Sequence, residues 1–361
     1  MNRILNFNAG PSTLPLPALE RARDDLVDYQ GKGMSILEMS HRGAEYLEIQ
    51  EKTKALFREL LQIPASHHIL FLGGGASFQF AMIPMNLLGH GKSADFAVTG
   101  SWAKKALQEA KRVGKTQVIY DGVSEQYTRL PDPKALSVHP DAAYVHLTSN
   151  ETIGGVEWMS WPETGKVPMV CDMSSDIMSR PIPVDRFGLI YAGAQKNLGP
   201  AGTAVVILRN DVLEACSAEL PTFLSYKTHV ENDSLYNTPP VFTVYLIQLT
   251  LQWLREQGGI AAAEQWARTR ADILYQAIDG SGGFYRCPVP VQFRSRMNVV
   301  FRLPSEDQEK KFIDEAKKQG MVGLKGHRSV GGCRASIYNA MPLEGAQTLA
   351  SFMKDFAKKQ G

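Results

Sequence analysis

The middle of the chain contains seven short runs of β-branched and other apolar residues, separated by stretches of helical or irregular character. The runs are Ile69–Leu72, Ala94–Val98, Thr116–Tyr120, Ala142–Leu147, Val167–Val170, Leu189–Ala192 and Thr203–Leu208. Continuous apolar character over so few residues is typical of strands that helices bury on both faces. The pattern therefore predicts an α/β fold with a mostly parallel, seven-stranded sheet covered by helices.

Apolar residues at helical spacing flank this region on both sides. They predict helices over Ala18–Tyr29, Ala44–Leu61, Phe242–Glu256 and Ala261–Ile278. Further along, the pattern predicts a strand over Met297–Leu303, a helix over Ser305–Gln319 with Ser305 as its N-cap, a strand over Cys333–Tyr338 and a helix over Leu343–Lys359. This alternation predicts a smaller α+β C-terminal domain. We expect residues 16–265 to form the large domain, and residues 1–15 and 266–361 the small one.

Composition and charge exclude several classes of protein. The 361 residues include 39 Lys and Arg against 37 Asp and Glu, a net charge of +2, so a nucleic-acid-binding surface is not expected. The four cysteines form no C-x-x-C pair and the histidines show no ligand spacing, so neither disulfides nor a metal site is expected. The chain begins without an apolar signal segment and has no apolar run of membrane-spanning length. We expect a cytoplasmic protein without membrane partners.

A glycine-rich segment, Gly73-Gly74-Gly75-Ala76-Ser77, follows the first predicted strand and opens a helix. Glycines allow close approach of an anion, and a helix N-terminus offers free N–H groups and a favourable dipole. The segment matches neither the dinucleotide fingerprint nor a Walker A loop. It is either a phosphate site or a tight strand-to-helix turn.

Two further residues point to covalent chemistry. Lys196 stands among glycines and small residues between two predicted buried strands, where a desolvated amine can act as a Schiff-base nucleophile. Asp172 follows another predicted strand, at the sheet edge where ligands bind. Taken singly, Lys196 could be an exposed turn lysine and Asp172 a helix cap. Together they form the pair that a pyridoxal-phosphate site needs, since an acid at the pyridine nitrogen keeps the ring electron-withdrawing.

Longer motifs along the whole chain resemble those of the phosphoserine aminotransferases, class-V enzymes of the aspartate-aminotransferase-like fold type I. They are Phe7–Pro11, Ser40–Gly43, Asn150–Gly155, Tyr191–Gly202, Tyr236–Pro240, Gly326–Gly332 and Arg334–Pro342. The resemblance implies transamination between L-glutamate and 3-phosphooxypyruvate, giving O-phospho-L-serine and 2-oxoglutarate in serine biosynthesis. Some relatives also use a phosphohydroxythreonine substrate in vitamin B6 synthesis, and the sequence leaves that question open.

The resemblance also implies roles at the cofactor, pyridoxal 5'-phosphate. Lys196 would bind it as a Schiff base and move the substrate α-proton, and Asp172 would pair with its ring nitrogen. Trp102 would stack on the ring and Thr152 would bond the phenolic oxygen. The phosphate group would be held by Ala76, Ser77 and Gln195, and by Asn237 and Thr238 from the second subunit of a homodimer.

Substrate binding is expected to depend on arginines, whose planar guanidinium group matches carboxylates and phosphates. The resemblance makes Arg334 the α-carboxylate anchor. His41 with Arg42, and His327 with Arg328, would meet the distal carboxylate or phosphate. A single arginine of this kind is more often part of a surface ion pair. Two separate His-Arg dipeptides, each beside a glycine, favour an anion pocket.

Two departures from the family pattern bear on substrate binding. Some relatives have an arginine where this chain has Ala76-Ser77, and some have a hydroxyl residue where it has Ala9. Without that arginine, the two His-Arg pairs would contribute more of the binding of the substrate's distal carboxylate or phosphate.

Other readings remain open at this stage. A cysteine desulfurase or an alanine–glyoxylate-type aminotransferase would share the fold. A desulfurase requires a reactive cysteine on a mobile loop, whereas Cys333 falls in a predicted strand. A protein that keeps the fold without catalysis is the remaining alternative, and the presence of both Lys196 and Asp172 speaks against it.

Overall fold

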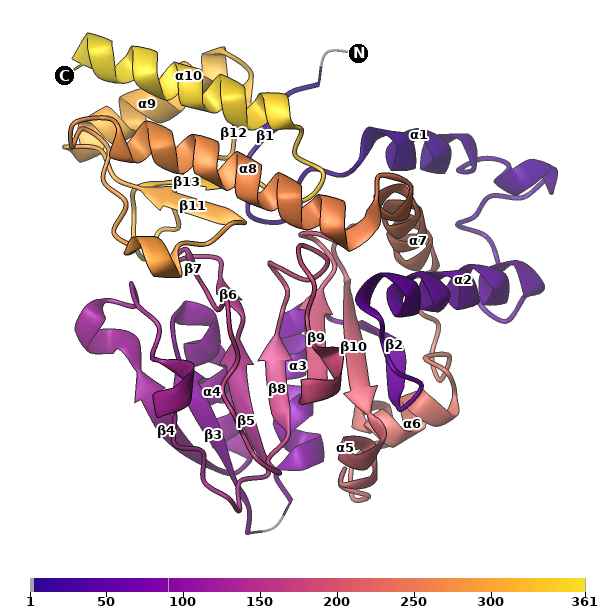
Figure 1. Ribbon diagram of the computed structural model, residues 1–361. Helices are drawn as coiled ribbons and strands as arrows, with labels where there is room; N and C mark the ends of the chain where they lie inside the picture. The colour runs from indigo at the N-terminus through magenta and orange to yellow at the C-terminus, as the bar shows by residue number, and fades with distance from the viewer. Residues whose placement is uncertain (1–2, 90, 361) are drawn as a thin grey trace.

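Seven strands form the central sheet of the computed structural model, which describes residues 3–89 and 91–360 (Figure 1). In spatial order they are β2 (His67–Gly73), β10 (Thr203–Arg209), β9 (Phe187–Gly193), β8 (Met169–Asp172), β5 (Tyr144–Thr148), β3 (Ser93–Val98) and β4 (Lys115–Asp121). β10 is antiparallel to both neighbours, and the remaining pairs are parallel. Each strand overlaps one of the seven apolar runs, so the predicted α/β fold with a mostly parallel sheet is confirmed.

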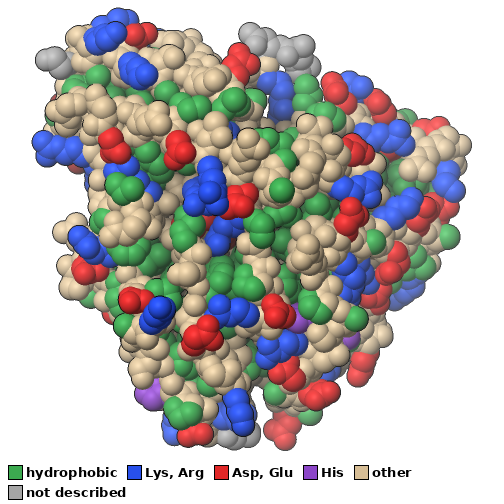
Figure 2. All heavy atoms as spheres, viewed as in Figure 1, with side chains coloured by type: hydrophobic (Ala, Val, Ile, Leu, Met, Phe, Trp, Pro, Cys, Tyr) green, Lys and Arg blue, Asp and Glu red, His purple; other side chains and the backbone are tan. Residues whose placement is uncertain are grey.

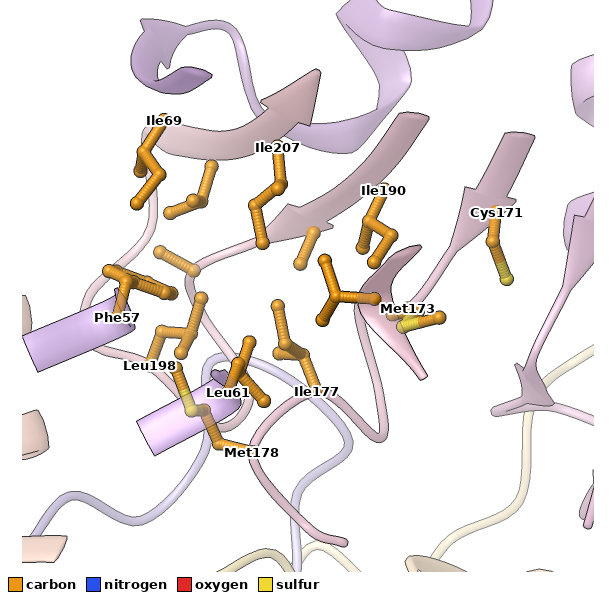
Figure 3. Packing of buried hydrophobic residues seen from close by; sticks show 14 of the residues in the cluster. Phe57, Leu61, Ile69, Cys171, Met173, Ile177, Met178, Ile190, Leu198 and Ile207 are labelled. Carbon is orange, nitrogen blue, oxygen red and sulfur yellow. The ribbon is translucent and has the colours of Figure 1, made fainter. Parts of the chain in front are cut away.

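Helices bury both faces of this sheet because its strands, apart from the largely exposed edge strand β4, are apolar on both sides. Ile69 and Phe71 of β2 pack in one cluster with residues of α2 (Ala44–Leu61) and α7 (Val241–Glu256). The intervening residues Leu70 and Leu72 pack in a second cluster with α3 (Gly75–Leu87) and α4 (Ser101–Val113). Figure 3 shows the first cluster, in which Phe57 and Leu61 of α2 face Ile69 and Ile207 of the sheet.

A second hydrophobic core lies beyond the carboxyl ends of most strands, above the sheet in Figure 1. Its strands are β11 (Asn298–Phe301) antiparallel to β13 (Cys333–Ser336), and β1 (Leu5–Asn6) parallel to β12 (Met321–Val322). Its helices are α8 (Gly259–Asp279), α9 (Glu306–Lys318) and α10 (Leu343–Gln360). Phe7 belongs to the same core, so the N-terminal segment packs with the C-terminal one. The domain limits at residues 15/16 and 265/266 remain predictions.

The remaining elements are short. A hairpin of β6 (Asn150–Glu151) and β7 (Val156–Glu157) projects from the end of β5, and α5 (Asn210–Glu214) and α6 (Tyr226–Glu231) follow β10. Ser305 caps α9 as predicted, because its hydroxyl accepts the N–H of Gln308 over 3.2 Å.

One predicted helix is wrong at its end. α1 spans Leu16–Asp24 and stops before Tyr29, which lies in the 3-10 turn Tyr29–Gly31. Asp25 is buried and accepts the hydroxyl hydrogen bond of Tyr245, and the Tyr29 ring packs edge-on against Tyr245 with centroids 5.6 Å apart. These tertiary contacts with α7 override the helical spacing of the apolar residues. The other predicted elements begin and end within one or two residues of the observed ones.

Acidic and basic side chains are interspersed over the face seen in Figure 2, in keeping with the small net charge. Across the described residues, no helix combines the length and the apolarity needed to span a membrane.

Candidate active site

Lys196 lies in the turn between β9 and β10, at the edge of the sheet where β8 and β5 also end. The ladder closes the base of this turn, where the N–H of Ala194 donates to the carbonyl of Thr203 over 2.9 Å. Only 8% of Lys196 is exposed. Its Nζ atom donates a hydrogen bond to Oγ1 of Thr152, 2.7 Å away. The amine is therefore held inside the protein by a neutral hydroxyl.

The pKa of Lys196 is lowered from 10.5 to about 8. Burial is the main cause, because it disfavours the ammonium form, and the positive charge of Arg334 acts in the same direction. The negative charges of Asp172 and Glu151 oppose the change. The shift favours the neutral, nucleophilic form of the amine relative to that of an exposed lysine.

Asp172 is the last residue of β8 and is 5% exposed. Its Oδ1 atom accepts hydrogen bonds from the N–H of Ser174 at 2.9 Å and from the Ser174 hydroxyl at 2.6 Å. Burial raises the pKa of Asp172, while the charge of Lys196 and the bonds from Ser174 lower it. Ser174 thus fixes one oxygen of the carboxyl group.

A cavity of about 580 Å³ contains both residues. Nine residues predicted from the sequence line it: Ala76, Ser77, Trp102, Thr152, Asp172, Gln195, Lys196, His327 and Arg334. Its wall also includes Ala9, Gly10, Gly74, Gly75, Phe80, Ile153, Ser174, Ala201 and Gly202. Ser174 could have been found from its position two residues after a strand-end aspartate, whereas Phe80 and Ile153 give no local signal.

The glycine-rich segment forms one side of the cavity, where β2 passes into α3. Gly74 has φ +89°, a left-handed conformation that favours glycine, and a Cβ atom there would lie 2.7 Å from that of Phe78. The N–H of Gly74 donates to the carbonyl of Gly202 over 3.1 Å, which joins this turn to the one that contains Lys196. The first residues of α3 line the same cavity as the lysine, and their N–H groups form a favourable environment for an anion.

Trp102 provides an aromatic wall. It lies in the first turn of α4, and its ring centroid is 5.5 Å from Nζ of Lys196. Its Nε1 atom is buried without a hydrogen-bond partner among the described residues. A flat ligand stacked here would be in contact with a large π-surface.

Arg334, on β13, reaches the cavity from the second core. Its Nη1 atom donates to the carbonyl of Thr152 over 3.2 Å, and its Nε atom is buried with no partner in the described part of the chain. Burial lowers the pKa of Arg334. Burial also lowers the pKa of the neighbouring His327, with further lowering by the charge of Arg334. This end of the cavity is positively charged and keeps an unused donor.

Five predicted site residues do not line the cavity of their own chain. They are His41, Arg42, Asn237, Thr238 and Arg328. All but the half-buried His41 are exposed. Their predicted roles remain predictions.

Comparison with known proteins places the chain in a family. Residues 4–349 match the family model of class-V aminotransferases. The phosphoserine aminotransferase of Geobacillus kaustophilus (strain HTA426) is 54% identical over 359 residues, which cover 99% of each chain. The solved structure of the phosphoserine aminotransferase from Bacillus circulans subsp. alkalophilus aligns with a TM-score of 0.98 at 52% identity, over 99% of both chains. The chain belongs to the phosphoserine aminotransferase family.

A second solved phosphoserine aminotransferase, described for radiation damage of its Schiff base, aligns with a TM-score of 0.97 at 48% identity, over 99% of this chain and 100% of that one. The resemblance inferred from the sequence motifs is confirmed, and so is the expectation of an enzyme. As a phosphoserine aminotransferase family member, the protein is an aminotransferase of serine biosynthesis. Pyridoxal phosphate is the cofactor that its homologues imply.

Sequence predictions also concerned the cysteines and the possible metal ligands of this phosphoserine aminotransferase family member, and the structure shows where the cysteines lie. Cys171, Cys216 and Cys333 are buried and Cys287 is half-buried. Burial raises the pKa of all four thiols, which disfavours the thiolate form that a desulfurase requires. Within residues 3–89 and 91–360, no three His, Cys, Asp or Glu side chains are grouped as metal ligands.

Proposed function

We propose that the protein catalyses pyridoxal-phosphate-dependent transamination between L-glutamate and 3-phosphooxypyruvate, giving O-phospho-L-serine and 2-oxoglutarate. The observation that supports this most directly is the buried Lys196 amine, which shares one cavity with Asp172, Trp102 and Arg334. Burying the amine of a lysine costs free energy unless a ligand or another residue interacts with it.

The residues around the cavity fit pyridoxal phosphate. The start of α3 suits a phosphate group, the Trp102 ring suits a flat aromatic system, and Asp172 suits a protonated pyridine nitrogen. The buried Nε1 of Trp102 and Nε of Arg334, each without a partner among the described residues, point to polar groups that a ligand would supply. The cavity that these residues line has a volume of about 580 Å³, which suits a small-molecule cofactor with its substrate.

Within this proposal, each residue has a separate task at the cofactor. Ala76, Ser77 and Gln195 hold the phosphate group, Asp172 the ring nitrogen and Thr152 the phenolic oxygen. When bound, the cofactor supplies an aldehyde that condenses with amines and a ring that withdraws electrons from the substrate Cα. Ser174 keeps the Asp172 carboxyl group oriented by occupying its Oδ1 atom.

Lys196 is the proton-transfer group. With a pKa of about 8, its amine can take the α-proton of the amino-acid substrate, hold it at Nζ and give it back later in the transfer. Thr152 accepts a hydrogen bond from Nζ and so limits the directions in which the amine can point. Burial keeps bulk water from competing for the proton.

Charged residues select the substrate. Arg334 binds the α-carboxylate that glutamate and phosphoserine share, through the donors that the protein leaves free. His327 and Arg328 meet the distal carboxylate or phosphate, together with His41 and Arg42.

The positions of four predicted site residues support a homodimer. His41, Arg42, Asn237 and Thr238 do not line the cavity of their own chain, so they could contribute to a site only across a subunit interface. The segment 16–47, which contains the first pair, exposes several large apolar side chains: Leu16, Leu26, Val27, Met34, Leu37 and Leu47. Val27 is 80% and Leu37 61% exposed, and Tyr236 is exposed next to Asn237 in the sequence. Exposed apolar side chains of this size are typical of a surface that another chain covers. We propose that a second copy covers it and receives Asn237 and Thr238 at its cofactor and His41 and Arg42 at its substrate.

Four thiols without disulfides suit a reducing cytoplasm.

Absorbance spectroscopy of the purified protein tests the proposal. The band of the bound cofactor should change on addition of L-glutamate and return on addition of 3-phosphooxypyruvate, but not of oxaloacetate. Lys196→Ala should abolish the cycle, with turnover reduced by at least about a thousandfold. Equal recovery with oxaloacetate, or near-normal turnover in Lys196→Ala, would refute it.

A further inference from the structure

Glu151 is a buried acid that lies outside the roles assigned so far. It is 1% exposed and ends β6, immediately before Thr152. No basic side chain forms an ion pair with it in the described part of the chain, so its carboxyl group is not part of an ordinary salt bridge. Burying such a group is unfavourable unless hydrogen bonds satisfy it.

Two backbone amides of another element satisfy this carboxyl group. Oε2 accepts the N–H of Trp102 over 3.1 Å, and Oε1 accepts the N–H of Ala103 over 2.9 Å. Both amides belong to the first turn of α4, where a negative charge is favoured. Gly100 offers no side-chain cap to this helix, and a Cβ atom at Gly100 would overlap the Glu151 carboxyl group. Glu151 thus caps α4 from a hairpin 48 residues away in the sequence.

The backbone of Glu151 fixes a second group. Its carbonyl accepts the N–H of Gly155 over 2.8 Å, which closes the hairpin that presents Thr152. Thr152 in turn accepts a hydrogen bond from Lys196 through its hydroxyl and from Arg334 through its carbonyl. Glu151 is therefore hydrogen-bonded to the backbone of Trp102 through its side chain and is the chain neighbour of Thr152.

We propose that Glu151 is a positioning residue, which holds the Trp102 indole and the Thr152 hydroxyl in a fixed relation around Lys196. A serine or aspartate at the N-cap position could cap α4 without a buried acid. The arrangement found here does more, because it prevents α4 and the β6–β7 hairpin from moving independently on the two sides of the amine. The inference rests on the proposed function, in which Trp102 and Thr152 contact the cofactor.

A double-mutant cycle on cofactor affinity tests this role without using activity. Cofactor-free wild type, Glu151→Gln, Trp102→Ala and the double variant are titrated with pyridoxal phosphate, and dissociation constants are taken from absorbance. Glu151→Gln replaces one acceptor by an NH2 group that opposes a backbone N–H, and should weaken binding about tenfold. Trp102→Ala should weaken binding by a similar factor. The double variant should be weakened by clearly less than about a hundredfold, because both changes disturb the same stacking contact and only the effect of Glu151 through Thr152 is independent of Trp102.

Matched variants separate positioning from general damage. Glu157→Gln alters another buried acid of the same hairpin, which accepts the N–H of Arg296 over 2.7 Å and pairs with Arg180, and should leave cofactor affinity within about twofold. Gly100→Ala displaces the Glu151 carboxyl group without changing it and should reproduce the effect of Glu151→Gln, which keeps the test valid if that variant does not fold.

Additive losses in the cycle, or an unchanged dissociation constant in both Glu151→Gln and Gly100→Ala, would overturn the positioning role while leaving the proposed function intact. Failure of the wild type to bind pyridoxal phosphate would instead refute the proposed function, and this inference with it.

Discussion

The side-chain amine of Lys196 and the hydroxyl of Thr152 lie 2.7 Å apart, although one belongs to the β9–β10 turn and the other to the β6–β7 hairpin. Replacing Thr152 by valine keeps the shape and removes the acceptor. We expect kcat to fall about tenfold, the effect of losing one hydrogen bond. Thr152→Ser keeps the hydroxyl and should retain most of the activity in the same steady-state assay. Equal losses in both variants would show that the hydroxyl is not what matters.

The lowered pKa of Lys196 predicts a pH dependence of stability. Between pH 8 and 10.5 the unfolded chain holds a proton that the folded chain has released, so stability rises with pH in this window. Below about pH 8 the buried ammonium group opposes folding by on the order of 3 kcal/mol. Relative to Lys196→Met, the cofactor-free wild type should therefore gain stability as the pH rises from about 8 to about 10.5.

Urea unfolding of both cofactor-free proteins at several pH values in this window measures the effect, since groups common to both cancel in the difference. Parallel stability curves for the wild type and Lys196→Met would mean that the amine titrates at its ordinary pKa when folded.

Arg334→Ala should raise KM for both glutamate and phosphoserine. The two substrates share an α-carboxylate, and a hydrogen-bonded charge pair of this kind contributes about 1.5–3 kcal/mol, or roughly ten- to a hundredfold in KM. Steady-state kinetics in the forward and reverse directions provide the comparison. An effect on phosphoserine alone would assign Arg334 to the distal phosphate.

Mixed dimers test the sharing of sites between subunits. Lys196→Ala and Arg42→Ala should each form dimers of low activity. When the two variants are unfolded and refolded together in equal amounts, half of the dimers are mixed, and each mixed dimer has one site with both residues intact. Activity should recover to about a quarter of the wild-type value. No recovery, with mixed dimers present by mass spectrometry, would place Arg42 in its own subunit's site.

Much of the fold and part of the site could be predicted from local patterns. Each of the seven strands coincides with an apolar run, Asp172 ends one strand, and Lys196 follows another, as the patterns around them indicate. Both meet in one cavity because the carboxyl ends of neighbouring parallel strands share an edge.

Contacts between distant segments could not be predicted in this way. The end of α1 depends on Tyr245, and the cap of α4 depends on Glu151, so neither is visible in the sequence around the helix itself. The residues that lie outside the cavity of their own chain, such as Arg42, were found through family motifs, because an exposed arginine gives no local sign of its partner.

The reversed direction of β10 has a mechanical consequence for the catalytic amine. If the strand before the lysine were followed by a crossover to a helix, only the N-terminal side of the lysine would be held by the sheet. The backbone on its C-terminal side could then move with the loop. Here the two ends of the segment 194–202 continue into β9 and β10, which pair with each other directly. The N–H of Gly74 also donates a hydrogen bond to the carbonyl of Gly202, at the C-terminal end of the segment. These bonds restrain the backbone on both sides of Lys196, so its amine changes position mainly by rotation about its own four side-chain bonds.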